Sequence, residues 1–210
     1  VIEKVSGKDY ERHVREEILA PPGIRRLQIG RSLKEGRAPG EVAYHATGDA
    51  TGPAVMGAVG SPVPWQYGGW CLESMDAHGG WVASAVDLAR FSAALDGSAR
   101  LRILSPRSLE VLFARPAGRA GHEENGSPSP AFYACGWMVR PAVRPAPEDG
   151  GANEWHTGGF DGTSTLLVRR HDGVGWVVLF NARSGKDGRD LSRIIHPLLH
   201  EAAGAVDRWP

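Results

Sequence analysis

The chain has 210 residues, of which 41% are hydrophobic, and its 24 basic and 24 acidic side chains give a formal net charge of zero. This length and apolar content suit one domain, or one and a half, with a hydrophobic core of its own. Balanced charge provides no global field to attract nucleic acid or an anionic membrane, so we expect neither as a partner. No apolar run approaches the roughly 20 residues of a membrane span.

Two local features indicate no special chemistry. Cys71 and Cys135 lie far apart without Cys-x-x-Cys spacing, so they predict neither a disulfide framework nor a zinc site. A basic stretch between Arg25 and Arg37 is surrounded by Gly and Pro. Such a stretch favours a solvated loop over a binding patch.

The first half of the chain predicts helices separated by irregular segments. Residues 1–19 fit the tail of one helix, a turn at Ser6-Gly7 and an amphipathic helix from about Asp9 that stops at Pro21-Pro22-Gly23. Residues 24–78 are rich in Gly and Pro, with short strands or turns expected near residues 41–47. Residues 84–95 predict a helix with Ser84 as its cap and Gly97 as its terminator. Residues 105–114 predict another, with Pro at its first position, and residues 118–130 predict a loop.

From residue 131 the hydrophobic period changes to that of strands. We predict strands at 132–139, 153–157, 163–170 and 175–181, with a Pro-rich loop at 141–147. His171-Asp172-Gly173 is a hairpin signal between the last two strands. Apolar residues at 191, 194, 195, 198 and 199 predict a closing helix. The order of elements indicates an α+β fold.

The most informative run is Trp155 to Gly159, W-H-T-G-G. Small residues at a strand end let a substrate approach the backbone closely, and His156 offers a titratable group. Taken without further context, the position of His156 favours a structural role, in which it satisfies a buried carbonyl. A nucleophile is missing, because the residues three before the four lysines are Val1, Val5, Arg31 and Arg183, which leaves no Ser-x-x-Lys pair. There is also no Gly-x-Ser-x-Gly elbow.

Metal binding is not expected. His196 and His200 have the i, i+4 spacing of two ligands, but no Glu follows His196 and Pro197 lies between them. This pattern favours surface or capping histidines, and we predict no metal and no cofactor.

Three segments resemble the serine β-lactamase and penicillin-binding-protein superfamily, in its β-lactamase-related branch of esterases and D-amino-acid peptidases. Residues 1–7 through 21–24 are similar to the helix and turn that follow the Tyr-x-Asn motif of that family. G-G-W-V-A-S-A-V-D-L-A-R-F at 79–91 is close to another family stretch. H-T-G-G-F-x-G at 156–162 resembles the third catalytic motif, Lys/His-Thr/Ser-Gly.

The resemblance implies the C-terminal portion of a β-lactamase/transpeptidase-like fold. Residues 1–129 would belong to its helical side, and residues 130–210 would form the antiparallel sheet and closing helix. His156 would support the proton network around the nucleophile, and the N–H of Gly159 would be an oxyanion-hole donor. Thr157, Gly158 and Phe160 would contact the substrate, an amide, β-lactam or ester.

Neither Ser-x-x-Lys nor Tyr-x-Asn occurs in these residues, so we expect this chain to be a fragment that is inactive alone. Faces left uncovered would then expose an apolar patch or be covered by self-association. The alternative is a non-catalytic binding or scaffold module derived from this fold. The cellular compartment is not predicted by these residues.

Overall fold

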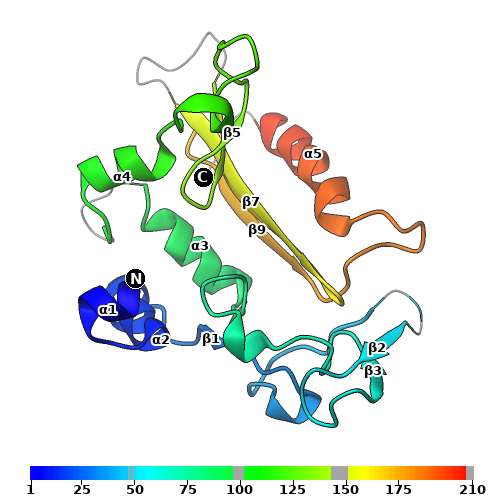
Figure 1. Ribbon diagram of the computed structural model, residues 1–210. Coiled ribbons are helices and arrows are strands. Elements are labelled where there is room, and N and C mark those ends of the chain that lie inside the picture. The colour runs from blue at the N-terminus through cyan, green and yellow to red at the C-terminus, as the bar shows by residue number, and fades with distance from the viewer. Residues whose placement is uncertain (47, 49, 97–101, 143–150, 207–210) are drawn as a thin grey trace.

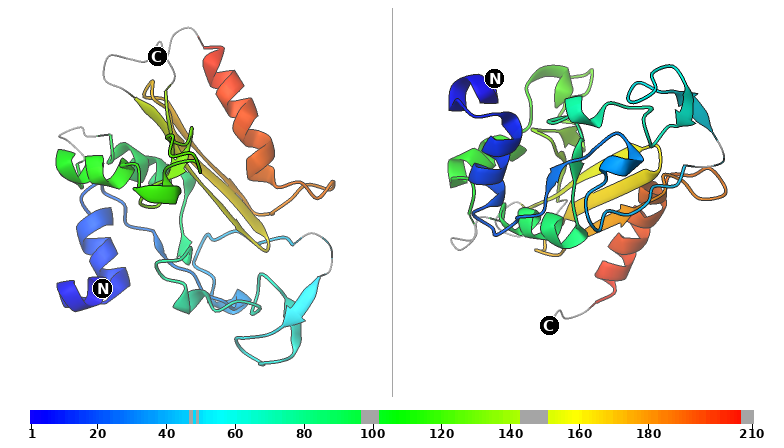
Figure 2. Two further views of the ribbon diagram at one scale, coloured as in Figure 1. Left: turned by 45° about the horizontal axis from the view of Figure 1, so that its top comes forward. Right: turned by 90° about the horizontal axis from the view of Figure 1, so that it is seen from below.

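A five-stranded antiparallel sheet forms the centre of the protein, in the strand order β5-β6-β7-β8-β9. The computed structural model describes residues 1–46, 48, 50–96, 102–142 and 151–206. The strands are β5 (Phe132–Tyr133), β6 (Met138–Pro141), β7 (Ala152–Phe160), β8 (Thr163–Arg169) and β9 (Gly175–Phe180). Helix α5 (Leu191–Gly204) covers one face, and α3 (Ala85–Ala93) packs on the other (Figures 1 and 2). The predicted α+β fold is confirmed.

Alternation along β8 explains why the sheet carries helices on both faces. Ser164, Leu166 and Val168 are buried, and they lie on the face beneath α5. Leu167 points the other way and packs on a cluster whose buried members are Leu95, Phe132, Trp137 and Val139. Because successive side chains of a strand point to opposite faces, one seven-residue strand contributes to two cores.

The predicted turn at His171-Asp172-Gly173 is confirmed, with Gly173 in the left-handed region at φ 83°. The single strand predicted over residues 132–139 is wrong, because the chain turns back at Gly136, φ 84°, and forms the β5–β6 hairpin. The strand predicted at 153–157 is longer than expected and includes all of W-H-T-G-G.

Strand register fixes which backbone groups of β7 face which neighbour. Phe160 and Thr163 flank a two-residue turn, so they exchange both hydrogen bonds of their pair. Hydrogen-bonded and non-hydrogen-bonded pairs alternate, so the N–H groups of residues 153, 155, 157 and 159 point away from β8. Those of residues 153 and 155 meet β6. Pro141 lies opposite Ala152 in a non-hydrogen-bonded pair, where no backbone N–H of β6 is needed to bond to β7. Proline, which lacks an N–H, therefore fits this position.

Helix α3 begins as predicted. The hydroxyl of Ser84 accepts the N–H of Asp87 at 3.1 Å and donates to its carboxylate at 2.9 Å. The helix ends at Ala93, with Ala94 as its C-cap, whereas Gly97 lies outside the described residues. Helix α4 (Pro106–Phe113) has Ser105 as its predicted cap and proline at its start.

The N-terminal segment packs beside α3 around a second core of Leu19, Ile24 and Leu27. After α1 (Ile2–Ser6), Asp9 caps α2 (Tyr10–His13), and the chain continues as the π-helix η1 (Val14–Leu19). The predicted helix therefore exists, but its second part is more loosely wound than an α-helix.

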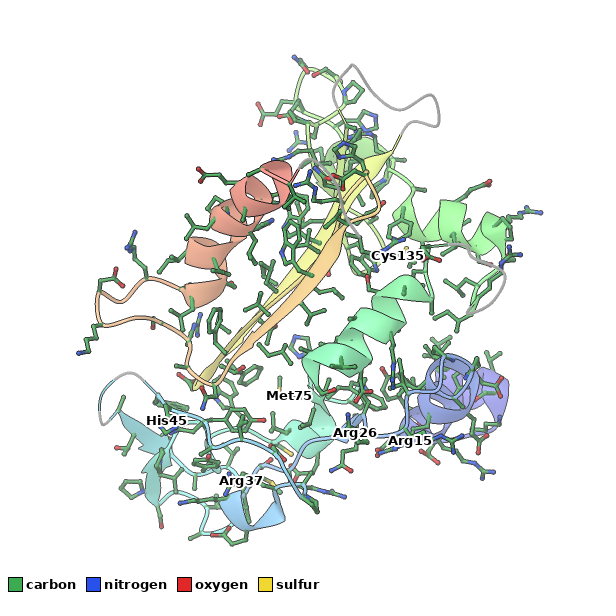
Figure 3. All side chains as sticks on the ribbon, turned by 180° about the vertical axis from the view of Figure 1, so that it is seen from behind. Arg15, Arg26, Arg37, His45, Met75 and Cys135 are labelled. Carbon is green, nitrogen blue, oxygen red and sulfur yellow. The ribbon has the colours of Figure 1, made fainter. Side chains whose placement is uncertain are left out.

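Residues 24–78 are mostly irregular, as predicted, and two short strand pairs involve this part of the chain. The first joins β1 (Gln28–Ile29) to β4 (Trp81–Val82), and the second joins β2 (Thr51–Pro53) to β3 (Pro62–Pro64). Near the turn of the β7–β8 hairpin, the N–H of His45 donates to Asn181 O at 2.9 Å (Figure 3).

Arg26 and Arg37 of the basic stretch lie in this irregular part, and the charged head of Arg26 is largely exposed (Figure 3). Cys71 and Cys135 are both free thiols. Across the described ranges, no helix has the length and apolar character needed to span a bilayer.

Candidate active-site edge

The W-H-T-G-G run lies in the second half of β7, where one strand edge is open. β6 pairs with β7 only as far as Trp155, while β8 accompanies it to Phe160. His156 and Thr157 are both exposed. Beyond Trp155, no other strand in the described part of the chain pairs with this edge. We call residues 156–160 and their uncovered backbone the open edge.

The side chains of the open edge divide between the two faces of the sheet. His156 lies opposite Leu167 of β8 and shares its face, on the side of α3 and α4. Thr157 lies opposite Leu166, on the side of α5. A molecule lying along this edge would therefore meet the imidazole on one side and the hydroxyl on the other.

His156 has a fixed partner. Its Nε2 atom lies 3.0 Å from the phenol oxygen of Tyr133, and the two rings are 5.8 Å apart. Tyr133 is half exposed and comes from β5, which the β5–β6 hairpin folds back toward β7. The sequence motifs did not indicate Tyr133. The contact was not predicted because residues 132–139 were expected to form a single strand, and only the β5–β6 hairpin brings residue 133 near residue 156.

Gly159 presents its backbone to the open edge. It stands opposite Ser164 in a non-hydrogen-bonded pair, so its N–H points away from β8. A Cβ at this position would approach only Asp190 Oδ2 at 3.7 Å and Arg183 Nε at 3.8 Å. The donor is thus held by a strand that is paired on its other side with β8.

Gly158 and Gly162 are required by close packing. A side chain at Gly158 would collide with the hydroxyl of Thr165. Gly162 has φ 82°, and a Cβ there would lie 2.8 Å from Tyr44 Cβ. The β7–β8 turn is therefore packed tightly against the irregular segment around residues 44–45.

Aromatic rings adjoin the far end of the open edge. Phe160 packs edge-on against Trp70 at 5.1 Å, and Trp70 lies 5.7 Å from Trp65. The indole N–H of Trp70 donates to Asp161 at 3.1 Å, although 39% of the residue remains exposed. Trp70 gave no signal in the sequence beyond its composition.

A buried polar network lies next to the open edge, on the α5 side of the sheet. Ser164 and Ser192 donate their hydroxyls to Asp190 Oδ1, each at 2.7 Å, and the N–H of Ser192 donates to the same atom at 2.9 Å. Burial opposes ionisation of Asp190, but these hydrogen bonds outweigh it and hold its pKa below the usual range. Asp190 caps α5, so one carboxylate joins that helix to the strand opposite Gly159.

His196 and His200 are less exposed than the surface or capping histidines expected from the sequence. Both are partly buried on the sheet-facing side of α5, and their Nε2 atoms lie 3.1 Å apart. They stand on the α5 side of the sheet, against Trp155 and Trp176, and do not contact His156.

These features define an α+β protein whose antiparallel sheet offers an accessible strand edge with an imidazole and a free backbone donor. A family model described as Beta-lactamase matches residues 1–199. The chain therefore belongs to the β-lactamase family, a family of hydrolases that share this fold. No curated protein sequence matches this chain.

Solved structures agree with the fold. The octameric penicillin-binding protein homologue of Pyrococcus abyssi is 23% identical, covers 97% of this chain and 40% of its own, and has a TM-score of 0.59. The D-amino acid amidase of Ochrobactrum anthropi SV3, complexed with D-phenylalanine, is 21% identical, with 98% and 55% coverage and a TM-score of 0.60. A penicillin-binding protein of Bacillus halodurans is 19% identical, with 94% and 52% coverage and a TM-score of 0.59. The chain spans about half the length of these proteins or less.

Proposed function

We propose that this chain supplies one wall of the active site of a serine hydrolase that works through an acyl-enzyme. The substrate would be an amide, a β-lactam or an ester. The observation that carries the proposal is the open edge itself, because it combines an accessible imidazole with an outward backbone N–H three residues away on one rigid strand. Family membership supports the reaction class.

In this proposal, Gly159 and His156 have distinct roles. The N–H of Gly159 donates to the oxyanion that forms when a nucleophile attacks the substrate carbonyl. His156, oriented by Tyr133, takes part in proton transfer at the nucleophile. Thr157, Gly158 and Phe160 line the substrate on either side, and Gly158 keeps the strand free of bulk.

The nucleophile is the part that these 210 residues do not provide, since no Ser-x-x-Lys pair occurs among them. We therefore propose that residues 1–129 belong to the helical side of the catalytic unit and residues 130–210 to its sheet, and that the isolated chain has no turnover. The purified chain should release no chromophore from a chromogenic cephalosporin or from p-nitrophenyl acetate. Release that is blocked by a serine-directed phosphonate would contradict this.

The catalytic roles are tested in a longer protein in which this chain is joined to a Ser-x-x-Lys segment. Replacing Gly159 by proline removes the outward donor, and we expect kcat to fall about 10²–10³-fold. Gly159→Ala keeps the backbone N–H, and its Cβ would lie no closer than 3.7 Å to any atom beyond its chain neighbours, so this variant should stay near the parent rate. His156→Gln should also abolish most turnover, while His156→Lys should retain part of it. Equal activity of Gly159→Pro and Gly159→Ala would exclude the oxyanion role.

A non-catalytic binding or scaffold module derived from this fold is the second candidate. The coding sequence upstream of Val1 separates the two. Ser-x-x-Lys and Tyr-x-Asn within about 150 codons support the enzyme, while a start codon or an unrelated domain supports the module. Self-association, as in the octameric Pyrococcus abyssi protein, is a further proposal that light scattering of the purified chain would test.

A further inference from the structure

Two histidines on the sheet-facing side of α5 form a close pair. His196 and His200 stand one helical turn apart, and their Nε2 atoms are separated by 3.1 Å. The two ring planes differ by only 30° and their centres lie 4.9 Å apart. The rings therefore lie alongside each other, with the same nitrogen of each brought together.

The surroundings hold both rings in this arrangement. The ring of His196 packs edge-on against Trp155 of β7 at 5.8 Å, and that of His200 packs edge-on against Trp176 of β9 at 4.8 Å. Because α5 is packed on the sheet, neither imidazole can turn away without disturbing an indole. The pair is preorganised by the core and does not depend on a flexible loop.

Burial and nearby positive charge both favour the neutral form of the two imidazoles. Burial lowers the pKa of both histidines. At His196 the pKa is lowered further by His200 and Arg140, and at His200 by Arg170 and Arg140, with Asp172 partly opposing this. Neutral imidazole is the form that coordinates metal ions. The same arginines repel a dication, so they set an upper limit on the affinity of any metal bound here.

We propose that His196 and His200 form a bidentate binding site for a divalent transition-metal ion. With metal–nitrogen bonds of about 2.0–2.1 Å, two ligands of a tetrahedral ion lie about 3.3 Å apart, and two at a right angle about 2.9 Å apart. The observed 3.1 Å falls between these values. The proposal is independent of the hydrolase function, since neither histidine belongs to the open edge.

The ligand set predicts which ions bind. Imidazole suits Cu²⁺, Ni²⁺ and Zn²⁺, and the usual order of affinity places Cu²⁺ first. Within the described ranges, no group of three or more His, Cys, Asp and Glu side chains is placed so that it could hold a metal ion. Solvent therefore completes the coordination, and we expect dissociation constants on the order of micromolar for Cu²⁺ and weaker for Zn²⁺.

The competing explanation is a simple N–H···N hydrogen bond between two neutral imidazoles. This explanation predicts that His196 and His200 bind metal ions no more tightly than a single exposed histidine elsewhere in the chain does. Calorimetric titration of the untagged chain with CuCl₂, NiCl₂ and ZnCl₂ at pH 7.5 separates the two. We expect one Cu²⁺ per chain, accompanied by quenching of tryptophan fluorescence from the two indoles that contact the pair.

Substitutions locate the ion. His196→Gln and His200→Gln should each weaken Cu²⁺ binding at least 10-fold, whereas His122→Gln, on a loop histidine, should leave it unchanged. His200→Cys keeps a metal ligand and should retain Zn²⁺ binding that His200→Gln loses. The proposal is overturned if the unmutated chain binds no ion, or if both glutamine variants bind as tightly as it does.

A measurement without mutation guards against misfolded variants. In the unmutated chain, substoichiometric Ni²⁺ should broaden the ring proton resonances of His196 and His200 before those of His122. Uniform broadening across all histidines would refute the site. Far-UV circular dichroism and urea midpoints of each variant establish that lost affinity is not lost structure.

Discussion

His156 Nε2 and the phenol oxygen of Tyr133 lie 3.0 Å apart, which joins the central strand β7 to the edge strand β5. The contact gives one nitrogen of the imidazole a defined partner, and so favours one arrangement of its ring protons. An exposed histidine without such a partner would sample both tautomers and several rotamers. Tyr133 is therefore a positioning residue for the proposed site.

Removing this hydroxyl should change His156 more than it changes the fold. In Tyr133→Phe, we expect the ¹⁵N shifts of the His156 ring to move toward a mixture of tautomers, because Nε2 loses its partner. The free energy of unfolding should change by less than about 1 kcal/mol, since the hydrogen bond is exposed. Tyr67→Phe is the control, because its hydroxyl accepts the N–H of Tyr44. An unchanged ring spectrum in Tyr133→Phe would contradict the positioning role.

Two of the hairpin turns of the sheet, β7–β8 and β8–β9, offer a matched pair of glycines. Gly162 and Gly173 have almost the same φ, 82° and 83°, but only Gly162 would bring a Cβ within 2.8 Å of Tyr44 Cβ. Alanine at Gly173 meets no neighbour and should cost about 1 kcal/mol of stability from backbone strain alone. Alanine at Gly162 adds the clash and should cost about 2–4 kcal/mol. Equal urea midpoints would mean that the turn does not pack on residue 44.

The lowered pKa of Asp190 predicts that the folded state loses stability in acid. Its pKa is lowered in the folded state, so it contributes stability that is present above its unfolded pKa, near 3.8, and is lost as pH falls through the folded value. Asp190→Asn should flatten the stability curve as the pH falls below about 4. Asp190→Ala should also cost about 2–3 kcal/mol at pH 7, because it removes the helix cap and leaves the buried Ser164 hydroxyl without its acceptor. Asp76→Asn, in a loop, is the control for both measurements.

Glu154 and Arg169 form an ion pair with side-chain exposures of only 15% and 16%. Arg169 also donates to the carbonyl of Leu95 at 3.0 Å and stacks on Phe113, so it ties the sheet to the helical side. Arg169→Met leaves the Glu154 carboxylate buried and unpaired, and should cost about 3 kcal/mol at pH 7. The double variant Arg169→Met/Glu154→Gln should recover a large part of this loss.

The pH dependence of Arg169→Met supplies a second check. Burial raises the pKa of Glu154 in the folded state, with Arg169 acting against it, so the variant loses that opposition. A raised pKa contributes stability that is fully present below the unfolded pKa and is lost as pH rises through the folded value. Urea unfolding should therefore show a smaller penalty for Arg169→Met at pH 5 than at pH 7. A penalty that is the same at both values would argue against an ionised, unpaired Glu154.

Local signals in the sequence were sufficient for the elements that local chemistry determines. Ser84 and Ser105 cap their helices as predicted, because a cap bonds to residues only three positions away. The turn at Gly173 likewise depends on a few neighbouring residues. The β5–β6 hairpin was missed because a strand-like run continues through Ala134 and Trp137, and only Gly136 marks the reversal.

The contacts of the candidate site could not be predicted, because they join distant parts of the chain. Tyr133 reaches His156 through the missed hairpin, and Trp70 contacts Phe160, which lies 90 positions later in the chain. His196 and His200 had a visible spacing, but their burial depends on how α5 lies on the sheet. Motif resemblance located His156 to Phe160, whereas the surroundings of these residues come only from tertiary structure.

Pro141 disfavours a one-residue shift in the register between β6 and β7. If β6 slid by one residue along β7 so that Pro141 stood opposite Asn153, it would face a group that requires a donor it does not have. The same slip would turn buried Val139 outward and bring the charge of Arg140 into the core. A single proline thus makes the shifted register less stable than the native one, and so contributes to the specificity of strand pairing.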